Sequence, residues 1–385
     1  MKKLAIITTH PIQYYAPVFQ MLSERGQISI RVFYTWGEAS VRKYDPGFDK
    51  KIQWDIPLLT GYDFEWVQNV AADPGTHHFN GIKTPRLVAQ VNNWQPDAVL
   101  IYGWGFNSHL KALRYFKGKL PIYFRGDSTL LDEQPGVRSA LKTVFLKWVY
   151  RHVDRAFYPG TNTKRYFEKY GLKDDQLTFA PHAIDNKRFA EDRMDEARAL
   201  REKLDIPDDD ILVLFAGKLE EKKSPILLLE GFLGLDKPNL HLLFAGNGPL
   251  EKELKEKTGN NSRVHFIDFQ NQTQMPVMYQ ASDLFCLPSA GPGETWGLAV
   301  NEAMAAGKTI LASDKVGSAN DLVKPGLNGA VFQANVLKSL TKKMDELTEN
   351  GKIALERLGN SSKGIIADWT IEHQVKAIEN SVNNG

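Results

Sequence analysis

The segment Pro288-Ser-Ala-Gly-Pro-Gly-Glu294-Thr-Trp-Gly297-Leu-Ala-Val-Asn-Glu302-Ala-Met-Ala-Ala-Gly307 is the most informative stretch of the chain for its fold. It follows the short apolar run Leu284–Leu287, which is typical of a buried strand, and residues 298–306 are mostly strong helix formers. Gly307 is suited to cap the end of that helix. A strand, a glycine-rich turn and a helix in this order predict one unit of a helix-covered parallel sheet.

Two carboxylates and a helix start indicate the chemistry of this segment. Glu294 precedes the predicted helix, so its side chain can reach a ligand at the helix N-terminus, and Glu302 lies about one turn into the helix. The backbone amides of Gly297 and Leu298 can bind an anion, because helix N-termini attract negative charge. A phosphate on the amides with hydroxyls on the carboxylates is the arrangement expected for a nucleotide sugar. The alternative is an ordinary helix with a solvent-facing glutamate.

The rest of the chain repeats this alternation of short apolar runs and helical patterns. It predicts an α/β fold with two doubly wound parallel sheets, one in each half of the chain. The strands predicted for the first sheet are Leu4–Thr8, Ile28–Tyr34, Ala98–Ile101, Ile122–Phe124, Arg155–Tyr158 and Leu177–Phe179. Those predicted for the second sheet are Ile211–Ala216, His241–Ala245, Val264–Ile267, Leu284–Leu287 and Thr309–Ala312. Ligands of such sheets bind beyond the carboxyl ends of the strands.

The charged stretch 185–196 separates the two sets of strands and would support a surface helix but no core. We therefore expect a Rossmann-like N-terminal domain over residues 1–188 and a second Rossmann-like domain over residues 189–369, facing each other across a cleft. A C-terminal helix over residues 370–385 is expected to pack back on the N-terminal domain.

Charge and composition narrow the classes of partner. The 385 residues have a formal net charge of +2, which argues against a nucleic-acid-binding protein. Residues 1–185 contain 24 basic and 17 acidic side chains, a net of +7, and the remainder contains 24 and 29, a net of −5. The first half is therefore expected to meet an anionic acceptor or membrane, and the second half must bind a diphosphate through locally placed lysines and amides.

The cysteine count and the hydropathy pattern predict the compartment. Cys286 is the only cysteine, so no intrachain disulfide can form and a reducing compartment is expected. The apolar run after Met1 is too short for a signal peptide and is interpreted as a first strand. Since no stretch is long enough to span a bilayer, we expect a cytoplasmic protein whose membrane contact, if any, is peripheral at the inner face.

Several motifs in the second half resemble the signature of family-four retaining glycosyltransferases, the glycogen-synthase-like group 1 transferases of GT-B fold. Glu294 and Glu302 stand in a Pro-Ser…Glu-x-Trp-Gly-Leu…Glu-Ala-Met-Ala-Ala-Gly frame. Phe215-Ala-Gly-Lys218-Leu-Glu-Glu-Lys-Lys223-Ser-Pro is similar to the family's Gly-Arg-Leu…Glu-Lys-Gly loop, with Lys218 in place of the arginine. Further matches are Leu243-Phe-Ala-Gly-Asn-Gly-Pro249, Ala281-Ser-Asp283 and Pro181-His-Ala-Ile-Asp185…Phe189.

The resemblance implies a donor site for a nucleoside-diphosphate sugar, most simply a UDP- or GDP-sugar, in the second domain. Lys218 and Lys223 flank a tight loop, so their ammonium groups can converge on the diphosphate and stabilise its departing charge; the alternative is a solvated lysine cluster that includes Lys222. By the same resemblance, Glu302 holds the ribose, Glu294 holds the sugar hydroxyls, and the loop Asp268-Phe269-Gln270 cups the base. The remaining donor-binding candidates are Gly217, Thr295, Trp296, Gly297 and Leu298.

The first half departs from the family pattern. Its opening loop contains His10, Gln13 and Tyr14 in a His-Pro-Ile-Gln-Tyr motif, which resembles a bacterial subgroup of the family. These residues are candidates for donor or acceptor contacts, although His10 could equally be structural. Asp127 follows the predicted strand Ile122–Phe124, where the family often has a histidine. It could accept the acceptor's proton or stabilise charge at the anomeric carbon, or it could pair with Arg125.

Tyr102 likewise replaces a histidine of many relatives and is a candidate for the acceptor site, whereas His109 is expected to be structural. His77 and His78 show no spacing for a metal, and no catalytic metal or cofactor is expected. The segment Arg138–Arg151 has apolar residues at helical spacing beside basic ones, so it is either a core-packing helix, which we favour, or a helix that docks on an anionic membrane.

The function expected from these features is the transfer of a sugar to a hydroxyl of a glycan, lipid-linked or small-molecule acceptor, in bacterial cell-surface polysaccharide or glycoconjugate synthesis. The alternatives are a nucleotide-sugar epimerase or phosphorylase of the same fold, and a non-catalytic subunit that binds a nucleotide sugar.

Overall fold

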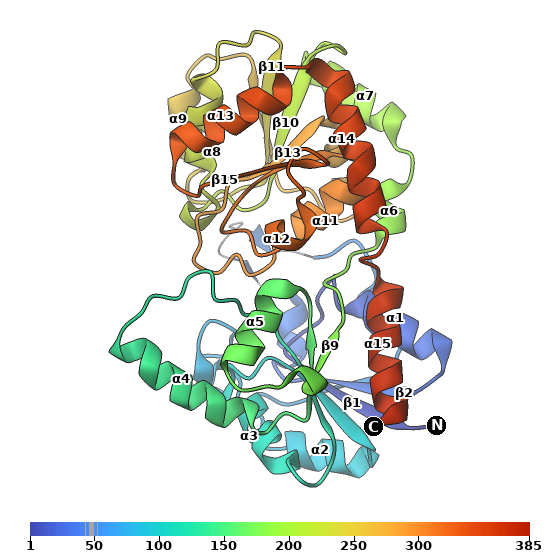
Figure 1. The fold of residues 1–385 in the computed structure, drawn as a ribbon. Helices are drawn as coiled ribbons and strands as arrows, with labels where there is room; N and C mark the ends of the chain where they lie inside the picture. The colour runs from blue at the N-terminus through green and yellow to red at the C-terminus, as the bar shows by residue number, and fades with distance from the viewer. Residues whose placement is uncertain (43, 46–49, 52) are drawn as a thin grey trace. The chain divides into compact units, whose positions relative to one another are not determined.

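The computed structural model describes residues 1–42, 44–45, 50–51 and 53–385, and these form two compact units. Unit 1 comprises Met1–Lys43, Ile56–His182 and Ile371–Gly385, and unit 2 comprises Tyr44–Asp55 and Ala183–Thr370. Each unit contains one parallel sheet with helices packed against it (Figure 1). The prediction of two Rossmann-like parallel-sheet domains is thereby confirmed.

The sheet of unit 1 has seven strands in the order β5-β2-β1-β6-β7-β8-β9. Its inner strand β1 is buried on both faces, which matches its run of apolar residues from Leu4 to Ile7. The strands are β1 (Lys3–Thr8), β2 (Ser29–Tyr34), β5 (Phe64–Trp66), β6 (Ala98–Tyr102), β7 (Ile122–Arg125), β8 (Arg155–Tyr158) and β9 (Leu177–Phe179). The helices are α1 (Ala16–Arg25), α2 (Leu87–Trp94), α3 (Asn107–Phe116), α4 (Val137–Tyr150), α5 (Thr161–Lys169) and α15 (Ile371–Asn384). Three short 3-10 helices are η1 (Glu38–Arg42), η2 (Phe79–Gly81) and η3 (Asp174–Gln176).

The sheet of unit 2 has six strands in the order β12-β11-β10-β13-β14-β15. They are β10 (Ile211–Ala216), β11 (Leu240–Ala245), β12 (Val264–Ile267), β13 (Leu284–Leu287), β14 (Thr309–Ser313) and β15 (Gly329–Phe332). The helices are α6 (Asn186–Ala190), α7 (Met194–Lys203), α8 (Pro225–Leu233), α9 (Glu251–Thr258), α10 (Met275–Ala281), α11 (Leu298–Ala305), α12 (Ala319–Leu322), α13 (Leu337–Thr348) and α14 (Gly351–Ile366), with the 3-10 helix η4 at Glu221–Lys223. A two-stranded ribbon, β3 (Tyr44–Asp45) with β4 (Lys50–Lys51), also belongs to this unit.

The strands β5 and β15, each at one edge of its sheet, were not predicted. β5 has Glu65 between two aromatic residues and β15 begins with Gly329, and both residue types are depleted in strands. Cys286 lies in β13 within the core of unit 2, as expected, and burial raises the pKa of its thiol.

The boundary between the units lies at residues 182 and 183 rather than at 188. The stretch 185–196 was expected to support no core, and this was wrong for Phe189, which is fully buried and packs on the ring of Tyr279 at 5.8 Å. Asp185 caps α6 by accepting a hydrogen bond from the amide of Arg188 at 3.2 Å. Because α6 packs on α10 and α11, residues 183–190 belong to unit 2.

The C-terminal helix α15 belongs to unit 1, where it packs on α1. Arg25 forms an ion pair with Glu379 at 3.0 Å, and the hydroxyl of Tyr123 donates to the carbonyl of Ser381 at 2.7 Å.

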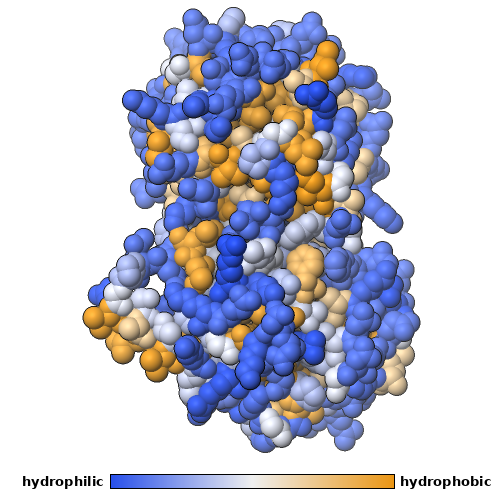
Figure 2. Space-filling model, in the orientation of Figure 1, coloured by the Kyte–Doolittle hydropathy of each residue, from blue (hydrophilic) through white to orange (hydrophobic). Residues whose placement is uncertain are grey.

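Helix α4 differs from the core-packing helix that we favoured. Its C-terminal part is buried through Leu146, Val149 and Tyr150, but its N-terminal part presents apolar side chains to solvent. The exposed residues are Val137 (80%), Leu141 (68%), Val144 (71%) and Phe145 (41%). Figure 2 shows an apolar patch at the place that α4 occupies in Figure 1.

Candidate functional site

In unit 2, the paired strands β10 and β13 bring two functional loops together at their carboxyl ends. Lys223 lies in η4 after β10, and its Nζ forms an ion pair with Oε2 of Glu294 from the loop after β13. The hydroxyl of Ser289 donates to the same carboxylate oxygen at 2.8 Å. Glu294 is 8% exposed, so this is a largely desolvated ion pair and not one of the weak pairs of a protein surface.

The backbone joins the same two loops. The amide of Ala290 donates to the carbonyl of Lys222 at 2.9 Å. The side chain of Lys222 itself is 44% exposed and pairs with Glu220 at 3.3 Å. Of the two neighbouring lysines, Lys223 therefore faces the carboxylate, and Lys222 lies at the solvent side with its own counter-ion.

The loop 288–297 is held by residues after β14. The amide of Gly317 donates to the carbonyl of Glu294 at 3.1 Å, and a Cβ on Gly317 would lie 1.7 Å from the carbonyl oxygen of Thr295. Only glycine allows so close an approach of the two backbones. The contact fixes the direction of the segment that includes Glu294 and Thr295.

Trp296 is 3% exposed, and its indole Nε1 donates to Oδ1 of Asn301 at 2.9 Å. Its ring packs on Trp369 at 5.3 Å. The side chain therefore fills the core beside the loop, and any contact of this residue with a donor would be made by its backbone.

Gly297 precedes α11 with a φ of +88°, and the helix begins at Leu298. Glu302 lies in α11 and is 3% exposed. The hydroxyl of Tyr279 in α10 donates to Oε2 of Glu302 at 2.7 Å. The alternative of a solvent-facing glutamate is therefore wrong for both Glu294 and Glu302, because each carboxylate is buried and accepts a hydrogen bond from a neighbouring hydroxyl.

The loop after β10 packs tightly on the loop after β11. A Cβ on Gly246 would lie 2.1 Å from the carbonyl oxygen of Gly217, and the amide of Leu219 donates to the carbonyl of Asn247 at 3.0 Å. Lys218, between Gly217 and Leu219, is half-buried. These contacts hold the backbone from which Lys218 extends.

The loop after β12 is connected to the same region by one asparagine. Oδ1 of Asn247 accepts from the amide of Phe269 at 2.9 Å, and its Nδ2 donates to Asp268 at 2.9 Å. The carboxylate of Asp268 thus has a structural partner. Phe269, the candidate for base contacts, is half-buried.

A short segment from the first half of the sequence lies against this loop. The ring of Trp54 meets Phe269 edge-on at 6.2 Å, and the amide side chain of Asn271 donates to the carbonyl of Gln53 at 2.7 Å. Asp55 accepts from the amide of Thr273 at 3.2 Å. Sequence reasoning grouped Trp54 with the first domain, and nothing in the pattern of residues 53–55 indicates this contact.

In unit 1, polar and aromatic residues gather after β6, β7 and β9. Arg125 is 3% exposed and donates to the carbonyls of Ala180 (2.8 Å) and Pro181 (3.2 Å). Tyr102 is 6% exposed, and its hydroxyl has no hydrogen-bond partner among the described residues. Burial raises the pKa of Tyr102 to about 12, so this hydroxyl is neutral and can donate to a ligand.

Tyr15 and His182 complete this cluster, and the sequence analysis assigned a role to neither. The ring of Tyr15 lies 4.7 Å from that of Tyr102 and stacks on His182 at 6.3 Å. Burial, with a contribution from the negative charge of Asp127, raises the pKa of Tyr15. Burial and the charge of Arg125 keep the pKa of His182 well below its usual value, so the imidazole is neutral.

The opening loop lies after β1. The Nδ1 of His10 hydrogen-bonds with the hydroxyl of Thr9 at 2.9 Å, and its ring meets Trp36 edge-on at 5.0 Å. Gln13 and Tyr14, like Asp127, are half-buried. Both roles considered for His10 therefore stay open, because the hydroxyl and the indole orient a ring that is still partly accessible.

His109 is fully buried, as expected for a structural residue. Its Nδ1 lies 3.0 Å from the carbonyl oxygens of Tyr102 and Gly103, and its Nε2 lies 2.8 Å from the hydroxyl of Thr35. Burial lowers the pKa of His109 to about 4. The neutral ring connects β6, α3 and the residue after β2.

His77 and His78 do have a partner, contrary to the expectation from their spacing. Asp73 lies 3.0 Å from Nε2 of His77 and 3.4 Å from Nε2 of His78. Among the described residues, these three side chains are the group of His, Cys, Asp or Glu close enough together to hold a metal ion. It lies in the exposed loop between β5 and η2, separate from Tyr102 and Arg125.

None of the helices formed by the described residues combines the length and the apolar character that crossing a bilayer requires.

Comparison with known proteins finds similarity mainly over the second unit. Residues 196–364 match the model of the family "Glycosyl transferases group 1". The chain is 28% identical over 204 residues to D-inositol 3-phosphate glycosyltransferase of Mycolicibacterium smegmatis (51% of this chain, 44% of the relative). It is 30% identical over 212 residues to alpha-monoglucosyldiacylglycerol synthase of Acholeplasma laidlawii (52% and 50%). The chain thus spans about half the length of the curated relatives it matches.

Solved structures resemble the whole chain. HepE of Anabaena, in complex with UDP and glucose, superimposes with a TM-score of 0.72 at 17% identity over 100% of both chains. Sucrose-phosphate synthase of Thermosynechococcus elongatus superimposes with a TM-score of 0.76 at 17% identity, over 100% of this chain and 99% of the other. At this identity the likeness concerns the fold.

Proposed function

We propose that this chain transfers a sugar from a nucleoside-diphosphate sugar to a hydroxyl acceptor, because it has the GT-B fold and its residues 196–364 match the model of group 1 glycosyl transferases. The observation that supports this most strongly is the buried cluster of Lys223, Glu294 and Ser289 at the carboxyl ends of β10 and β13. The matched region 196–364 contains every donor-site candidate.

We assign the diphosphate to Lys218, Lys223 and the amides of Gly297 and Leu298. Two ammonium groups and a helix N-terminus stabilise the charge that develops on the leaving diphosphate. Glu294 is assigned to the hydroxyls of the transferred sugar and Glu302 to the ribose. The hydroxyls of Ser289 and Tyr279 orient these two carboxylates.

The donor is proposed to be a UDP- or GDP-sugar. HepE, the structural relative, binds UDP and glucose. The base would contact the loop of Phe269. The ring of Phe269 also contacts Trp54. Gly217, Thr295 and Trp296 would contribute backbone contacts to the same donor.

The transfer is proposed to retain the anomeric configuration, as expected for family four and its subgroup with the His-Pro-Ile-Gln-Tyr opening. In such a reaction the acceptor hydroxyl attacks from the face that the diphosphate leaves. We assign the acceptor and the reacting centre to unit 1. The candidate residues there are His10, Gln13, Tyr14, Tyr102 and Arg125. Asp127 is proposed to stabilise positive charge at the anomeric carbon or to accept the acceptor's proton.

The acceptor is proposed to be a glycan, a lipid-linked sugar or a small molecule, used in the cytoplasm in bacterial cell-surface polysaccharide or glycoconjugate synthesis. The curated relatives named above act on an inositol phosphate and a diacylglycerol, to judge from their names. The exposed apolar residues Leu141 and Val144 of α4 lie beside Arg138 and Lys142, and an apolar face with basic neighbours binds an anionic membrane surface. We therefore propose peripheral docking through α4.

A thermal-shift panel of UDP, GDP and ADP, each with and without its sugars, tests the donor assignment. A ligand at 100 times its Kd stabilises the native state by about 2.7 kcal/mol. For a unit of this size, that raises Tm by roughly 5–10 °C. Stabilisation by a nucleoside diphosphate in the wild type, but not in a Lys223→Ala, Glu294→Ala double variant, supports the site; equal stabilisation of both would refute it.

Product analysis tests the reaction. Transfer with the donor's anomeric configuration is expected, and an inverted product would refute retention. Epimerised donor in the absence of acceptor, or a dependence on phosphate, would instead indicate an epimerase or a phosphorylase. Donor binding without release of nucleoside diphosphate would indicate a non-catalytic subunit.

A further inference from the structure

Unit 2 contains a polar pocket at the end of the sheet opposite to the donor-site loops. Its volume is about 230 Å³, and it is lined by residues of α7, α10 and α14 together with Asp283 and Lys308. Asp283 immediately precedes β13 and Lys308 immediately precedes β14, so the pocket lies at the amino ends of these strands. Glu294 and Ser289 follow the carboxyl end of β13. An anion in this pocket would therefore be distinct from the diphosphate of the donor.

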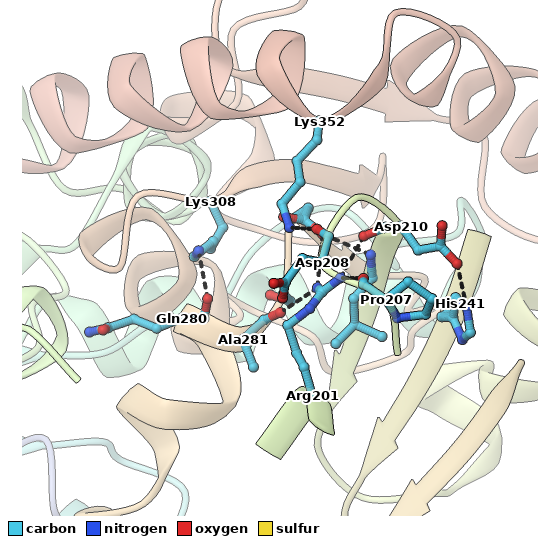
Figure 3. Close-up of polar contacts among 12 residues, drawn as sticks. Arg201, Pro207, Asp208, Asp210, His241, Gln280, Ala281, Lys308 and Lys352 are labelled. Atoms are coloured by element: carbon cyan, nitrogen blue, oxygen red, sulfur yellow. Dashed lines mark hydrogen bonds and ion pairs between the residues drawn. The ribbon is translucent and has the colours of Figure 1, made fainter. Parts of the chain in front are cut away.

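Lys308 is a cation of the pocket that has unfilled hydrogen-bond donors. Its Nζ donates to the carbonyl of Gln280 at 3.1 Å, which is its one hydrogen bond to the described residues (Figure 3). An ammonium group has three donors, so two remain for a ligand. Burial lowers the pKa of Lys308 to about 8, and Asp283 opposes this shift. The lowered pKa reflects a desolvated amine without a counter-ion in direct contact.

Arg201 lines the same pocket and is 5% exposed. Its terminal nitrogens donate to the carbonyls of Ala281, Pro207 and Asp210 at 3.0, 2.7 and 2.6 Å (Figure 3). Its Nε is buried and has no hydrogen-bond partner among the described residues. A buried donor without a partner is rare in proteins, because it costs the desolvation energy of the group.

The acidic residue nearest to these cations is already neutralised. Asp283 accepts from the amide of Leu212 at 2.8 Å and lies 3.3 Å from Arg201 and 3.5 Å from Lys352. Two cations thus share Asp283, and Lys352 also donates to the carbonyl of Asp208 at 2.7 Å. The other lining charges are Arg198, which reaches the pocket from α7, and the exposed Asp208 and Glu356. Arg198 also pairs with Asp195 at 3.5 Å, whereas Lys308 forms no ion pair within 4.0 Å among the described residues.

We propose that this pocket binds a small phosphate-bearing anion, held by Lys308 with support from Arg198 and Arg201. A tetrahedral oxyanion has several acceptors that can pair with the unfilled donors of a lysine and an arginine at once. The volume is below the range of about 300–1,000 Å³ typical of sites for drug-sized ligands, so the ligand is inorganic phosphate or a small phosphate monoester. The proposal does not depend on the proposed function, because it uses neither the donor loops nor unit 1.

The full-length chain is titrated with inorganic phosphate and, separately, with glycerol phosphate by calorimetry, and variants of the pocket residues distinguish this pocket from the donor loops. Tighter binding of the monoester would identify a phosphorylated metabolite as the ligand, and equal binding would identify free phosphate. In either case, Lys308→Met is expected to weaken binding at least tenfold, and Arg198→Gln to weaken it less. Lys308→Arg, which keeps the charge, should restore part of the affinity.

Lys342→Met is the matched control, because Lys342 is 73% exposed on α13 and outside the pocket. Its affinity for phosphate should equal that of the wild type. Equal affinities of the wild type and Lys308→Met would overturn the proposal, as would the absence of binding by the wild type. Because Lys308→Met removes a buried charge while retaining the length of the side chain, it should fold, and its circular dichroism spectrum and UDP affinity check this.

Discussion

Replacing Lys223 by alanine tests the donor site most directly, because its neighbour Lys222 provides a control of identical chemistry. The Lys223 side chain is 20% exposed and pairs with Glu294, which is 9% exposed, whereas Lys222 is 44% exposed and pairs with Glu220. A charge-assisted hydrogen bond of this kind contributes about 1.5–3 kcal/mol, which corresponds to roughly 10–150-fold in affinity. Lys223 already donates to Glu294, so fewer of its donors remain for a diphosphate. We therefore expect the Kd for UDP to rise about 10–30-fold, at the lower end of that range.

The assay compares UDP with uridine, since uridine lacks the phosphates. Lys223→Ala should weaken the binding of UDP and leave the affinity for uridine unchanged. Lys222→Ala should alter both affinities by less than about twofold. Turnover of the donor should fall about 10²–10³-fold, the usual cost of removing one group that stabilises developing charge. A UDP affinity within twofold of the wild type for Lys223→Ala, or an equal loss for Lys222→Ala, would refute the reasoning.

The same substitution has a cost in stability. Lys223→Ala removes one of the two side-chain donors among the described residues that contact the carboxylate of Glu294. The hydroxyl of Ser289 then remains. The loss is expected to be about 1–2 kcal/mol, below that of a fully buried pair because Lys223 is partly exposed. The fold is therefore retained, and circular dichroism at 25 °C should match that of the wild type.

The remaining predictions concern four other features. Tyr279→Phe removes the hydroxyl that donates to Glu302, so uridine and UDP should both bind about 5–10-fold more weakly, in contrast to Lys223→Ala; unchanged uridine affinity would contradict the ribose assignment. Val144→Ser should lower the affinity for anionic vesicles, measured by co-sedimentation, about tenfold, since a valine buried in the membrane contributes about 1.5 kcal/mol or more; neutral vesicles serve as the control. The pKa of His109 is about 4 in the folded state and lower than in the unfolded state, so the unfolded chain binds the proton first as pH falls. The contribution of His109 to the free energy of unfolding should thus be complete above pH 6.5 and decline by about 3 kcal/mol toward pH 4. His109→Gln should lower by about one the number of protons taken up on acid unfolding. An unchanged slope of the free energy of unfolding against pH would exclude His109 as its source. Incubation with EDTA should leave turnover within twofold, and a loss restored by a divalent cation would show that the reaction needs a metal.

The local sequence was sufficient to predict most of the fold. All eleven predicted strands are present, because a strand buried on both faces needs an apolar run such as Leu4–Ile7, which is legible without knowledge of its neighbours. The strands β5 and β15 were missed because Glu65 interrupts the first and Gly329 opens the second, and both residue types are depleted in strands. Of the site, the donor-loop candidates were predicted from their positions after β10 and β13, where ligands of parallel sheets bind, and from the resemblance to the family, and their roles stay predictions.

Other features depend on contacts between distant residues, and no local pattern indicates them. Phe189 stands in a charged stretch yet is fully buried against Tyr279. Trp54 is more than 200 residues from Phe269 in sequence but lies against it. The reverse holds for Val144, which has the helical spacing of a core residue and is exposed because α4 packs only through its C-terminal part.

The sequence by itself thus determined the parallel sheets and the residue types available at their carboxyl ends, because strand burial and helix starts are properties of a few consecutive residues. Only the tertiary structure decided which charges are paired. Lys222 and Lys223 are adjacent in sequence and equal in chemistry, yet only Lys223 meets a buried carboxylate, 71 residues away. The electrostatic energy of a side chain depends on its solvent exposure and on the distance to its partner, and both are set when separate strands come together in one sheet.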